Sequence, residues 1–526
     1  MRAVETVLFL VAGGAVVAAF ARQLRAPAPS LLVIAGLAVG LIPGVPDITV
    51  TPDLVSLVVL PPLLYAAAEE LPWRDLKAVW RPVAVLAVGL VLASAGAVAV
   101  VAGILAPMPA SMAFVLGAVL ASTDPVAVSA LGRRLSLPPR VQVLVQAEGL
   151  FNDATSLVLF QIAVGVAVAA PVARATPAGL LLHGCLRFAA LTVGGAAVGA
   201  AVAAGVIAVR RRVTDPVLEA VIALVTPYAA YVLGATLDVS GVLAVIVAGL
   251  VIGTYRDRIT TAQTRLQLHS VYQTVIFLLE SVVFSLIGLR LPALIRALPN
   301  VQSWPLIALA VAGTLLATRV LWVFPVTVVA ARRAGSRRPS WPVPAVVSWA
   351  GTRGVVPLAA ALSIPLVTSA GAPLAGRDLL LVVTAAVIVF SLLIQGLTLE
   401  PLVRLTGLAR PAAARHEETV ARLRLAEAGL ARLDELASED AAPDELIDLV
   451  RDGLQARVED ARTRTSGARP AHPGGLTEAE LRRDVLAAER AELARLYQDG
   501  TISDAARRRL ERTLDLEAAR LSDAQQ

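Results

Sequence analysis

The sequence predicts an all-α polytopic membrane protein, with about 13 transmembrane helices in two inverted repeats, discontinuous crossing helices and a cytoplasmic helical tail. With 57% hydrophobic residues, 16% charged residues and a mean hydropathy of +0.74, the 526-residue chain is too apolar for a soluble domain. Its apolar stretches repeatedly reach the roughly 20 residues that a spanning helix needs. Two of these stretches are interrupted and carry a charge near their centre, which indicates a transport site.

Hydropathy and turn residues divide the first 410 residues into about thirteen spans. We expect them at 4–21, 30–46, 53–70, 82–106, 111–131, 142–170, 178–209, 216–236, 239–254, 270–289, 303–331, 341–365 and 378–403. The composition then changes to Ala, Arg, Glu and Leu, which predicts two domains, a membrane domain over 1–410 and a helical domain over 411–526. The first holds 28 Lys and Arg against 16 acidic residues, and the second holds 18 against 24.

The loop charges predict the orientation of these spans. Eighteen Lys and Arg residues fall in loops on one side, and six on the other: Arg2, Arg174, Arg187, Arg290, Arg296 and Arg377. Because cytoplasmic loops carry the excess of basic residues, we expect a multi-pass protein of the cell membrane with its N-terminus outside and its tail in the cytoplasm. Residues 1–25 also resemble a signal peptide, but its cleavage would leave Arg22 and Arg25 outside, against the pattern of every later loop.

An odd number of spans permits inverted repeats. If spans one to six and eight to thirteen are the repeats, the first begins outside and the second inside. Span 111–131 then corresponds to span 341–365. The first is interrupted at Thr123, Asp124 and Pro125, and the second at Gly351, Gly354 and Pro357. Pro and Gly kink many spanning helices, but matching positions with an ionisable residue in each favour a pair of broken helices at a transport site.

Three charges are expected near the membrane midplane. At 1.5 Å per residue, Asp124, Asp153 and Arg353 each lie about halfway through a core of roughly 30 Å. An ionised Asp at that depth costs at least about 2.5 kcal/mol, so it indicates a functional site with an ion or a proton as partner.

Further polar residues share one flank of the span that carries Asp153. Glu148 and Asn152 are four residues apart, as are Asn152 and Ser156, while Asp153 and Ser156 are three apart. Hard oxygen ligands of this kind suit an alkali cation, for which Asp153 and Asp124 are the candidate metal ligands. The four histidines are scattered, and the single Cys185 excludes an internal disulfide.

Four motifs carry a family resemblance: STDPVAV (122–128), EGLFNDA (148–154), WAGTRGVVPLAAALSIP (349–365) and FSLLIQGLTLEPLVRLTGL (390–408). In this order they resemble the monovalent cation:proton antiporter family, which includes NhaP-type and animal sodium/proton exchangers. The resemblance covers about residues 1–410. It implies an ion site at Asp153 with Thr123, Asp124, Asn152 and Ser156 nearby and a structural ion pair between Glu148 and Arg353. It also implies homodimers and electroneutral exchange of one cation for one proton.

One position departs from the family pattern. The family commonly places Glu after a Pro-Pro-apolar-apolar-aromatic run, where PPLLYA here has Ala66. Glu69, one turn later, could substitute for it. Alternatively, Glu69 and Glu70 face water at the end of the span, which we favour. Glu280 and Arg319 are further intramembrane charges without a specific signal. Glu280 could line a cytoplasmic funnel, and Arg319 could pair with an acid or extend to the membrane surface.

The tail shows amphipathic spacing, with Pro and Gly interrupting it between Thr465 and Gly475 and a capping-box pattern at Thr477 and Glu480. A regulatory or dimer-stabilising domain and a plain solvated extension are both compatible with it. The sequence contains neither a dinucleotide-binding nor a Walker-type motif, so it offers no support for a cofactor or an ATP-driven pump.

The resemblance and the site together favour a sodium (or lithium)/proton antiporter of the cytoplasmic membrane, for pH and sodium homeostasis. Potassium/proton exchange is the alternative within the class. A cation channel is the alternative outside it, but a channel would not need paired broken helices. An enzyme is disfavoured because no constellation of nucleophile and base emerges. The expected partners are the cation, protons, the lipid bilayer and a second copy of the chain, with no nucleic acid.

Overall fold

The structure is a computed structural model. It describes residues 27–42, 55–124, 137–168, 177–213, 215–260, 262–298, 302–333, 341–409, 411–439, 443–466 and 478–499, with isolated helical positions at 12–17, 19, 23, 510 and 514. Within these ranges the regular secondary structure is helical, and the described residues form one isolated bridge, between Val367 and Pro373. The all-α prediction is therefore confirmed. Contacts divide the chain into two compact units, Met1–Pro411 and Ala412–Gln526.

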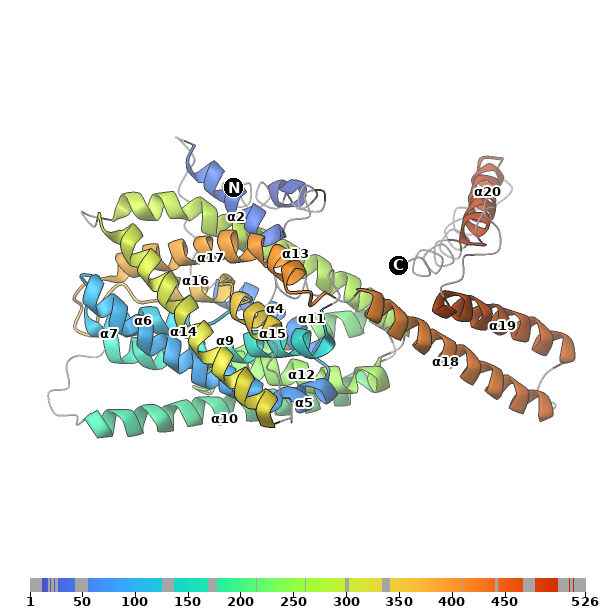
Figure 1. Ribbon diagram of the computed structural model, residues 1–526, viewed down its shortest axis with the longest axis horizontal. Helices are drawn as coiled ribbons and strands as arrows, with labels where there is room; N and C mark the ends of the chain where they lie inside the picture. The colour runs from blue at the N-terminus through green and yellow to red at the C-terminus, as the bar shows by residue number, and fades with distance from the viewer. Residues whose placement is uncertain are drawn as a thin grey trace. The chain divides into compact units, whose positions relative to one another are not determined.

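The membrane unit follows the expected spans (Figure 1). Among the described residues, seven helices are long and apolar enough to cross a bilayer, and four shorter ones are also apolar. The first expected span, 4–21, lies largely outside the described residues. The others are α2 (Ala28–Gly40), the π-helical turn η1 (Val55–Val59) with α4 (Leu60–Glu69), the continuous helix of α5 (Trp73–Ala84), η2 (Val85–Leu90) and α6 (Val91–Leu105), α7 (Ala110–Leu120), α9 (Pro139–Val168), α10 (Pro177–Arg210), α11 (Pro216–Thr236), α12 (Gly241–Ile259), α13 (Ala262–Ala297), α14 (Trp304–Arg333), α15 (Pro342–Trp349), α16 (Val355–Leu362) and α17 (Arg377–Leu405).

Local sequence explains where several of these helices begin. Pro139, Pro177, Pro216 and Pro342 are each the first helical residue, where proline's fixed φ is already helical and its missing N–H is not needed. Asp215 caps α11, because its Oδ1 accepts hydrogen bonds from the backbone N–H groups of the second and third helical residues, at 2.7 and 3.2 Å.

The helices of the membrane unit form two groups. One consists of α2, α4 and α10 to α13, with extensive packing of α2 on α13 and of α12 on α4, α10 and α11. We call this group the scaffold bundle. The other consists of α5, η2, α6, α7, α9 and α14 to α17, and we call it the crossing bundle because it contains the interrupted helices. Less extensive contacts, such as those between α9 and α10, join the two groups.

Two close helix contacts reveal the inverted repeat. Gly36 and Gly40 of α2 lie directly against the backbone carbonyls of Ser285 and Leu289 in α13, where any Cβ would collide. The same four-residue glycine spacing allows α12 to approach α4 in the same way. Such spacing lets two helix backbones come close without steric cost.

In the second contact, Gly249 and Gly253 of α12 lie against the carbonyls of Tyr65 and Glu69 in α4. Counted along the predicted spans, α2 and α13 are the second and tenth, while α12 and α4 are the ninth and third. Moving seven spans along the chain leads from α2 to α12 and from α4 to α13, so one pair corresponds to the other. This is the offset expected for two repeats of six spans separated by one extra span. The loop charges give the two pairs opposite directions across the membrane.

Both expected interruptions are present. The helix α7 ends at Leu120, and residues 122–124 are non-helical, whereas residues 125–131 of the expected span lie outside the described residues. The expected span 341–365 is split into α15 and α16, with residues 350–354 non-helical between them. These non-helical segments carry backbone groups without helical partners, and they position the site described below.

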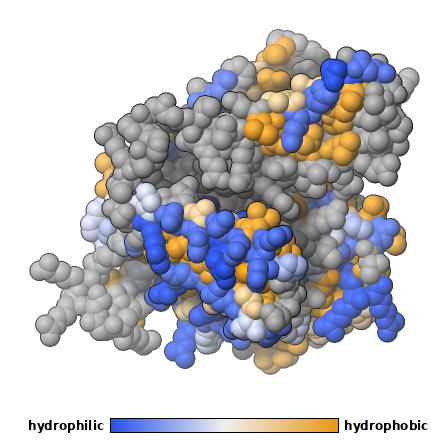
Figure 2. Space-filling model, turned by 90° about the vertical axis from the view of Figure 1, so that its right-hand side faces the viewer, coloured by the Kyte–Doolittle hydropathy of each residue, from blue (hydrophilic) through white to orange (hydrophobic). Residues whose placement is uncertain are grey.

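The C-terminal unit contains α18 (Pro411–Ser438), α19 (Asp444–Ser466) and α20 (Glu478–Gln498). Ion pairs of Arg451 with Asp434 and of Arg462 with Glu427 join α18 to α19, so these helices run antiparallel. A space-filling view of the molecule shows hydrophilic and hydrophobic residues side by side on one face (Figure 2). The break beside Pro443 was not predicted. The end of α19 at Ser466 and the start of α20 at Glu478 agree with the break expected at 465–475.

Candidate functional site

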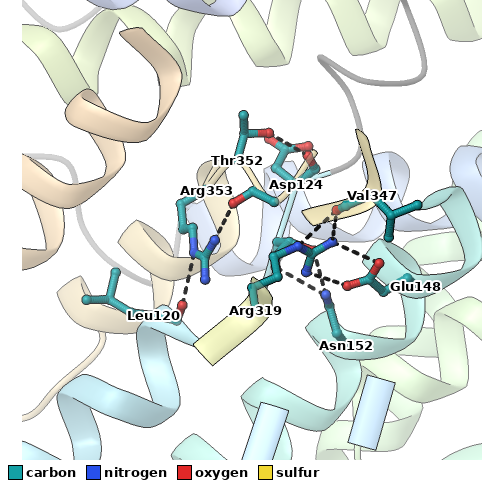
Figure 3. A network of polar contacts seen from close by, with 10 residues as sticks. Leu120, Asp124, Glu148, Asn152, Arg319, Val347, Thr352 and Arg353 are labelled. Carbon is teal, nitrogen blue, oxygen red and sulfur yellow. Dashed lines mark hydrogen bonds and ion pairs between the residues drawn. The ribbon is translucent and has the colours of Figure 1, made fainter. Parts of the chain in front are cut away.

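The two interrupted helices meet at Asp124 and Thr352 (Figure 3). The backbone N–H of Asp124 donates a hydrogen bond to the carbonyl oxygen of Thr352 at 2.7 Å. The Thr352 hydroxyl in turn donates to the carbonyl oxygen of Asp124 at 2.9 Å. Each segment thereby supplies hydrogen-bond partners to backbone groups of the other segment that have no partner within a helix. This pairing allows two non-helical segments to cross inside an apolar bundle.

Arg353 holds the ends of two helices at this crossing. It is 3% exposed, and its Nε donates to the carbonyl of Leu120, the last residue of α7, at 3.2 Å. Its Nη1 donates to the carbonyl of Gly351, just beyond the end of α15. Because the C-terminal end of a helix carries partial negative charge, a guanidinium at this point offsets both helix dipoles. The backbone N–H of Arg353 is fixed by the Ser391 hydroxyl at 3.0 Å.

The expected ion pair of Glu148 with Arg353 is wrong, because the structure pairs Glu148 with Arg319. Nη1 and Nη2 of Arg319 donate to the two carboxylate oxygens of Glu148 at 2.5 and 2.9 Å, and both side chains are almost fully buried. Arg319 also donates to the carbonyl of Val347 near the end of α15, at 3.0 and 3.1 Å. The pair therefore connects α9, α14 and α15 beside the crossing. Depth along the sequence could not distinguish the two arginines.

Asn152 and Thr123 are held to each other. The Asn152 Nδ2 donates to the Thr123 hydroxyl oxygen at 2.6 Å, and the backbone N–H of Thr123 donates to the Asn152 Oδ1 at 3.2 Å. The Ser156 hydroxyl donates to the carbonyl of Ala118 at 2.6 Å. Through these hydrogen bonds, side chains of α9 position the end of α7 and the non-helical segment that follows it. Three of the expected site residues thus have a positioning contact.

Asp153 and Asp124 line one cavity of about 770 Å³ between the two bundles. Asp153 is 5% exposed, and the lining of the same cavity also includes the acidic residues Glu70 and Glu280. The carboxylate of Asp124 lies against the α-carbon of Gly354, so closely that a Cβ at residue 354 would collide with it. The crossing therefore places the carboxylates of Asp124, just after α7, and Asp153, on α9, in the same cavity.

The cavity follows one face of each of three helices. Ser270, Gln273, Phe277 and Phe284 lie on one side of α13 at helical spacing, while Gln146, Leu150 and Asp153 do so on α9. On α4, the lining runs from Leu60 to Glu70. Polar residues gather at the end marked by Glu70, Gln146 and Ser270. This end lies on the side that the loop charges assign to the cytoplasm.

The structure also shows where the departure from the family pattern at Ala66 and the nearby acidic residues lie. Ala66 lies on the cavity wall, as the family position would. Glu69 is not part of that lining, and its carboxylate lies 3.9 Å from Arg256 with 13% of the side chain exposed, so it neither replaces a cavity residue nor simply faces water. Glu70 and Glu280 line the cavity.

A second buried ion pair was not predicted from the sequence. Arg210, at the end of α10, donates to Glu219 of α11 at 2.6 and 3.2 Å and to the Thr260 hydroxyl at 3.0 Å. It lies within the scaffold bundle and away from the crossing. Sequence reasoning assigned Arg210 to a loop because it begins a run of three arginines. Only the first of them is buried, which helical periodicity across 207–212 could have suggested.

Comparison with known proteins shows which proteins the chain resembles. Residues 8–405 match the family model "Sodium/hydrogen exchanger, transmembrane". The chain is 33% identical to an uncharacterized Na(+)/H(+) exchanger of Mycobacterium tuberculosis, over 98% of this chain and 96% of that one. It is 29% identical to the Na(+)/H(+) antiporter ApNhaP of Aphanothece halophytica, over 85% and 82%.

The fold resembles a solved structure as well. The sodium proton antiporter MjNhaP1 of Methanocaldococcus jannaschii superposes with a TM-score of 0.62 at 21% identity, covering 78% of this chain and 99% of that one. At this identity the match concerns the fold alone.

Proposed function

The chain belongs to the sodium/hydrogen exchanger family, and we propose that it exchanges one sodium ion for one proton through Asp153. It is a secondary transporter and not an enzyme. The observation that carries the proposal is the shared cavity of Asp153 and Asp124 at the crossing of two interrupted helices. In such folds the substrate site lies at the interface of the repeats, where broken helices expose backbone groups.

Competition at one carboxylate is sufficient for exchange. Asp153 binds either a proton or a cation, and its burial makes a bare charge unfavourable while the site crosses the membrane. If the crossing bundle moves only when Asp153 is occupied, each cation carried one way requires a proton carried the other way. Asp124 supplies a second oxygen ligand from the same cavity.

The neutrality of Asn152 supports a one-for-one ratio. Both polar atoms of its amide are engaged with Thr123, so the residue preceding Asp153 positions the helix end and carries no second titratable proton. One sodium for one proton moves no net charge. We therefore propose electroneutral exchange, independent of the membrane potential.

Potassium/proton exchange is the alternative within this class. Selection between the ions depends on the number and spacing of oxygen ligands, and Ala66 removes one carboxylate from the cavity wall. A more spacious, less charged wall favours a larger and more weakly hydrated ion. Glu70, at the polar end of the same helix face, attracts either cation toward the site.

The cellular role follows from exchange and orientation. The excess of basic loops on the cavity's polar side supports a cytoplasmic opening, with the N-terminus outside and the tail inside. In a cell membrane, exchange in this arrangement would serve pH and sodium homeostasis. We also propose a homodimer, because the scaffold bundle exposes large apolar side chains on α10 and α11, such as Val193 and Val217.

The test uses purified protein in liposomes with a trapped pH-sensitive dye. External sodium, lithium or potassium is added, with the membrane potential clamped at zero or at a negative value. Wild type should move protons in response to sodium at equal rates under both potentials, and Asp153→Asn should abolish the response. Asp378→Asn is the matched control, since Asp378 is an exposed acid near the start of α17.

Proton movement that survives Asp153→Asn would exclude Asp153 as the shared site. A response to potassium alone would favour the alternative exchange. Sustained current without counter-transport would identify a channel.

A further inference from the structure

A second concave site lies on the opposite side of α9 from the ion cavity. It is an apolar groove of about 310 Å³, lined by α5 and η2, α9, α10 and Leu243 of α12. From α9 it takes Phe151, Ala154 and Val158, which alternate along the helix with the ion-site residues Asn152, Asp153 and Ser156. We call it the lateral groove.

The groove is long and narrow, and its shape suits a hydrocarbon chain. On the helix Trp73–Leu105, its lining recurs every three or four residues from Trp73 to Val88, which marks one continuous face. Fifteen residues at 1.5 Å each extend about 22 Å, most of the thickness of one bilayer core. The lining is apolar along this length except at Lys77 and two threonines.

Charge and aromatic rings are concentrated at one end of the groove. The Lys77 ammonium lies 5.0 Å from the centroid of the Trp73 ring, and the Arg81 guanidinium lies 5.6 Å from that of Trp80. Both tryptophans and Lys77 belong to the groove lining. Exposed Trp side chains beside basic residues are typical of the headgroup level of a membrane. The one acidic neighbour on this helix turn, Asp75, is exposed and outside the lining.

From this combination we propose that the lateral groove binds an anionic phospholipid, with its headgroup at Lys77 and Arg81 and one acyl chain along the groove. Basic pockets between transmembrane helices bind anionic headgroups, and the apolar wall accepts the chain without desolvating polar groups. The proposal goes beyond ion exchange and does not depend on which cation is carried.

The position of the groove gives the lipid an effect on transport. The groove is walled by the crossing bundle through α5 and α9 and by the scaffold bundle through α10 and α12. A lipid seated there touches both bundles and stabilises the arrangement seen in this structure. Any movement of α9 that reorients Asp153 must change the groove, so binding of the lipid and movement of the ion site are coupled.

The first test measures lipid retained by the full-length protein. The protein is purified from vesicles of phosphatidylglycerol and phosphatidylcholine in equal amounts, and bound lipid is quantified by mass spectrometry. Wild type should retain phosphatidylglycerol selectively. Lys77→Gln with Arg81→Gln should lower its affinity by about fivefold for each charge removed. Arg211→Gln with Arg212→Gln is the matched control, because both residues are exposed at the end of α10 and outside the groove.

A second variant tests the groove without changing charge. Ala84 is exposed and lines the groove, so Ala84→Trp fills it, whereas Ala78→Trp adds the same ring on α5 outside the lining. Only the first should abolish selective retention. Lys77 is also the only lysine of the chain, so an amine-reactive probe reports on it alone besides the N-terminus. Phosphatidylglycerol should slow its labelling relative to phosphatidylcholine.

Three outcomes would overturn the proposal. Equal loss of lipid in the Arg211/Arg212 control would show general attraction to the membrane surface. Equal retention of phosphatidylcholine would show an apolar groove without headgroup recognition. Unchanged retention in Ala84→Trp would place the lipid elsewhere.

Discussion

Asp124 and Thr352, which are 228 positions apart in the chain, bond to each other through both backbone and side chain where the two interrupted helices cross. The Thr352 hydroxyl donates to the Asp124 carbonyl at 2.9 Å, and the Asp124 N–H donates to the Thr352 carbonyl at 2.7 Å. A buried backbone group without a partner costs about 1–3 kcal/mol, so this reciprocal pairing stabilises a crossing that would otherwise be unfavourable.

The first prediction concerns the hydroxyl in this pairing. Thr352→Val keeps the shape of the side chain but leaves the Asp124 carbonyl without its donor. We expect a loss of about 1–2 kcal/mol in stability and slower exchange, measured by thermal unfolding and by dye-loaded liposomes. Thr352→Ser restores the donor and should recover most of both. Equal behaviour of the Val and Ser variants would show that the hydrogen bond is unimportant.

The second prediction concerns Glu148 and Arg319. Removing one partner of a buried ion pair leaves the other charge uncompensated, at about 3–5 kcal/mol, so Glu148→Gln should lower the yield and the unfolding temperature. Arg319→Gln in addition should cost less than the sum of the two single changes, because both charges are then gone. Arg353→Gln combined with Glu148→Gln should show weaker coupling, because the carboxylate of Glu148 is paired with Arg319. Strong coupling to Arg353 and none to Arg319 would contradict the geometry.

These residues show what the sequence could and could not predict. Mid-membrane depth follows from counting along each span, so the convergence of Asp124, Asp153 and Arg353 was predictable. The partner of Glu148 was not, because Arg319 and Arg353 lie at similar depths on different helices. The choice between them depends on helix rotation and on which helices are neighbours, which are properties of tertiary packing.

The fold shows the same division between local and tertiary information. Hydropathy located the spans, and Pro or Gly beside a charge located both interruptions. The close contact of Gly36 and Gly40 with α13 could not be assigned, since four-residue glycine spacing marks a close contact without naming the partner. On the cavity face of α13 only Glu280 was considered from the sequence, and the other lining residues were missed for another reason. Its polar residues, such as Gln273, occupy one face of a helix that is apolar overall.

The third prediction concerns Gly354, which the Asp124 carboxylate touches at the α-carbon. Gly354→Ala places a methyl group where that carboxylate lies, so Asp124 must move out of the cavity wall. We expect exchange to fall by at least tenfold, measured in liposomes. Gly313→Ala is the matched control, because the space beside Gly313 in α14 is open and Ala favours a helix by about 0.5–1 kcal/mol. Normal exchange in Gly354→Ala would remove Asp124 from the ion site.

The last prediction concerns the charge carried per cycle and rests on Asn152. Asn152→Asp keeps an oxygen to accept the Thr123 N–H, and the Thr123 hydroxyl can rotate to donate to the second oxygen, so the variant should fold. It adds a carboxylate next to Asp153 that can carry a further proton. Exchange by wild type should be the same at zero and at negative internal potential, whereas exchange by Asn152→Asp should respond to the potential. Asn152→Ala is the control, because it loses both hydrogen bonds to Thr123 without adding a charge. It should slow exchange without making exchange depend on the membrane potential. If wild type itself responds to the potential, a second titrating group takes part in every cycle, and Asp124 is then the residue to examine.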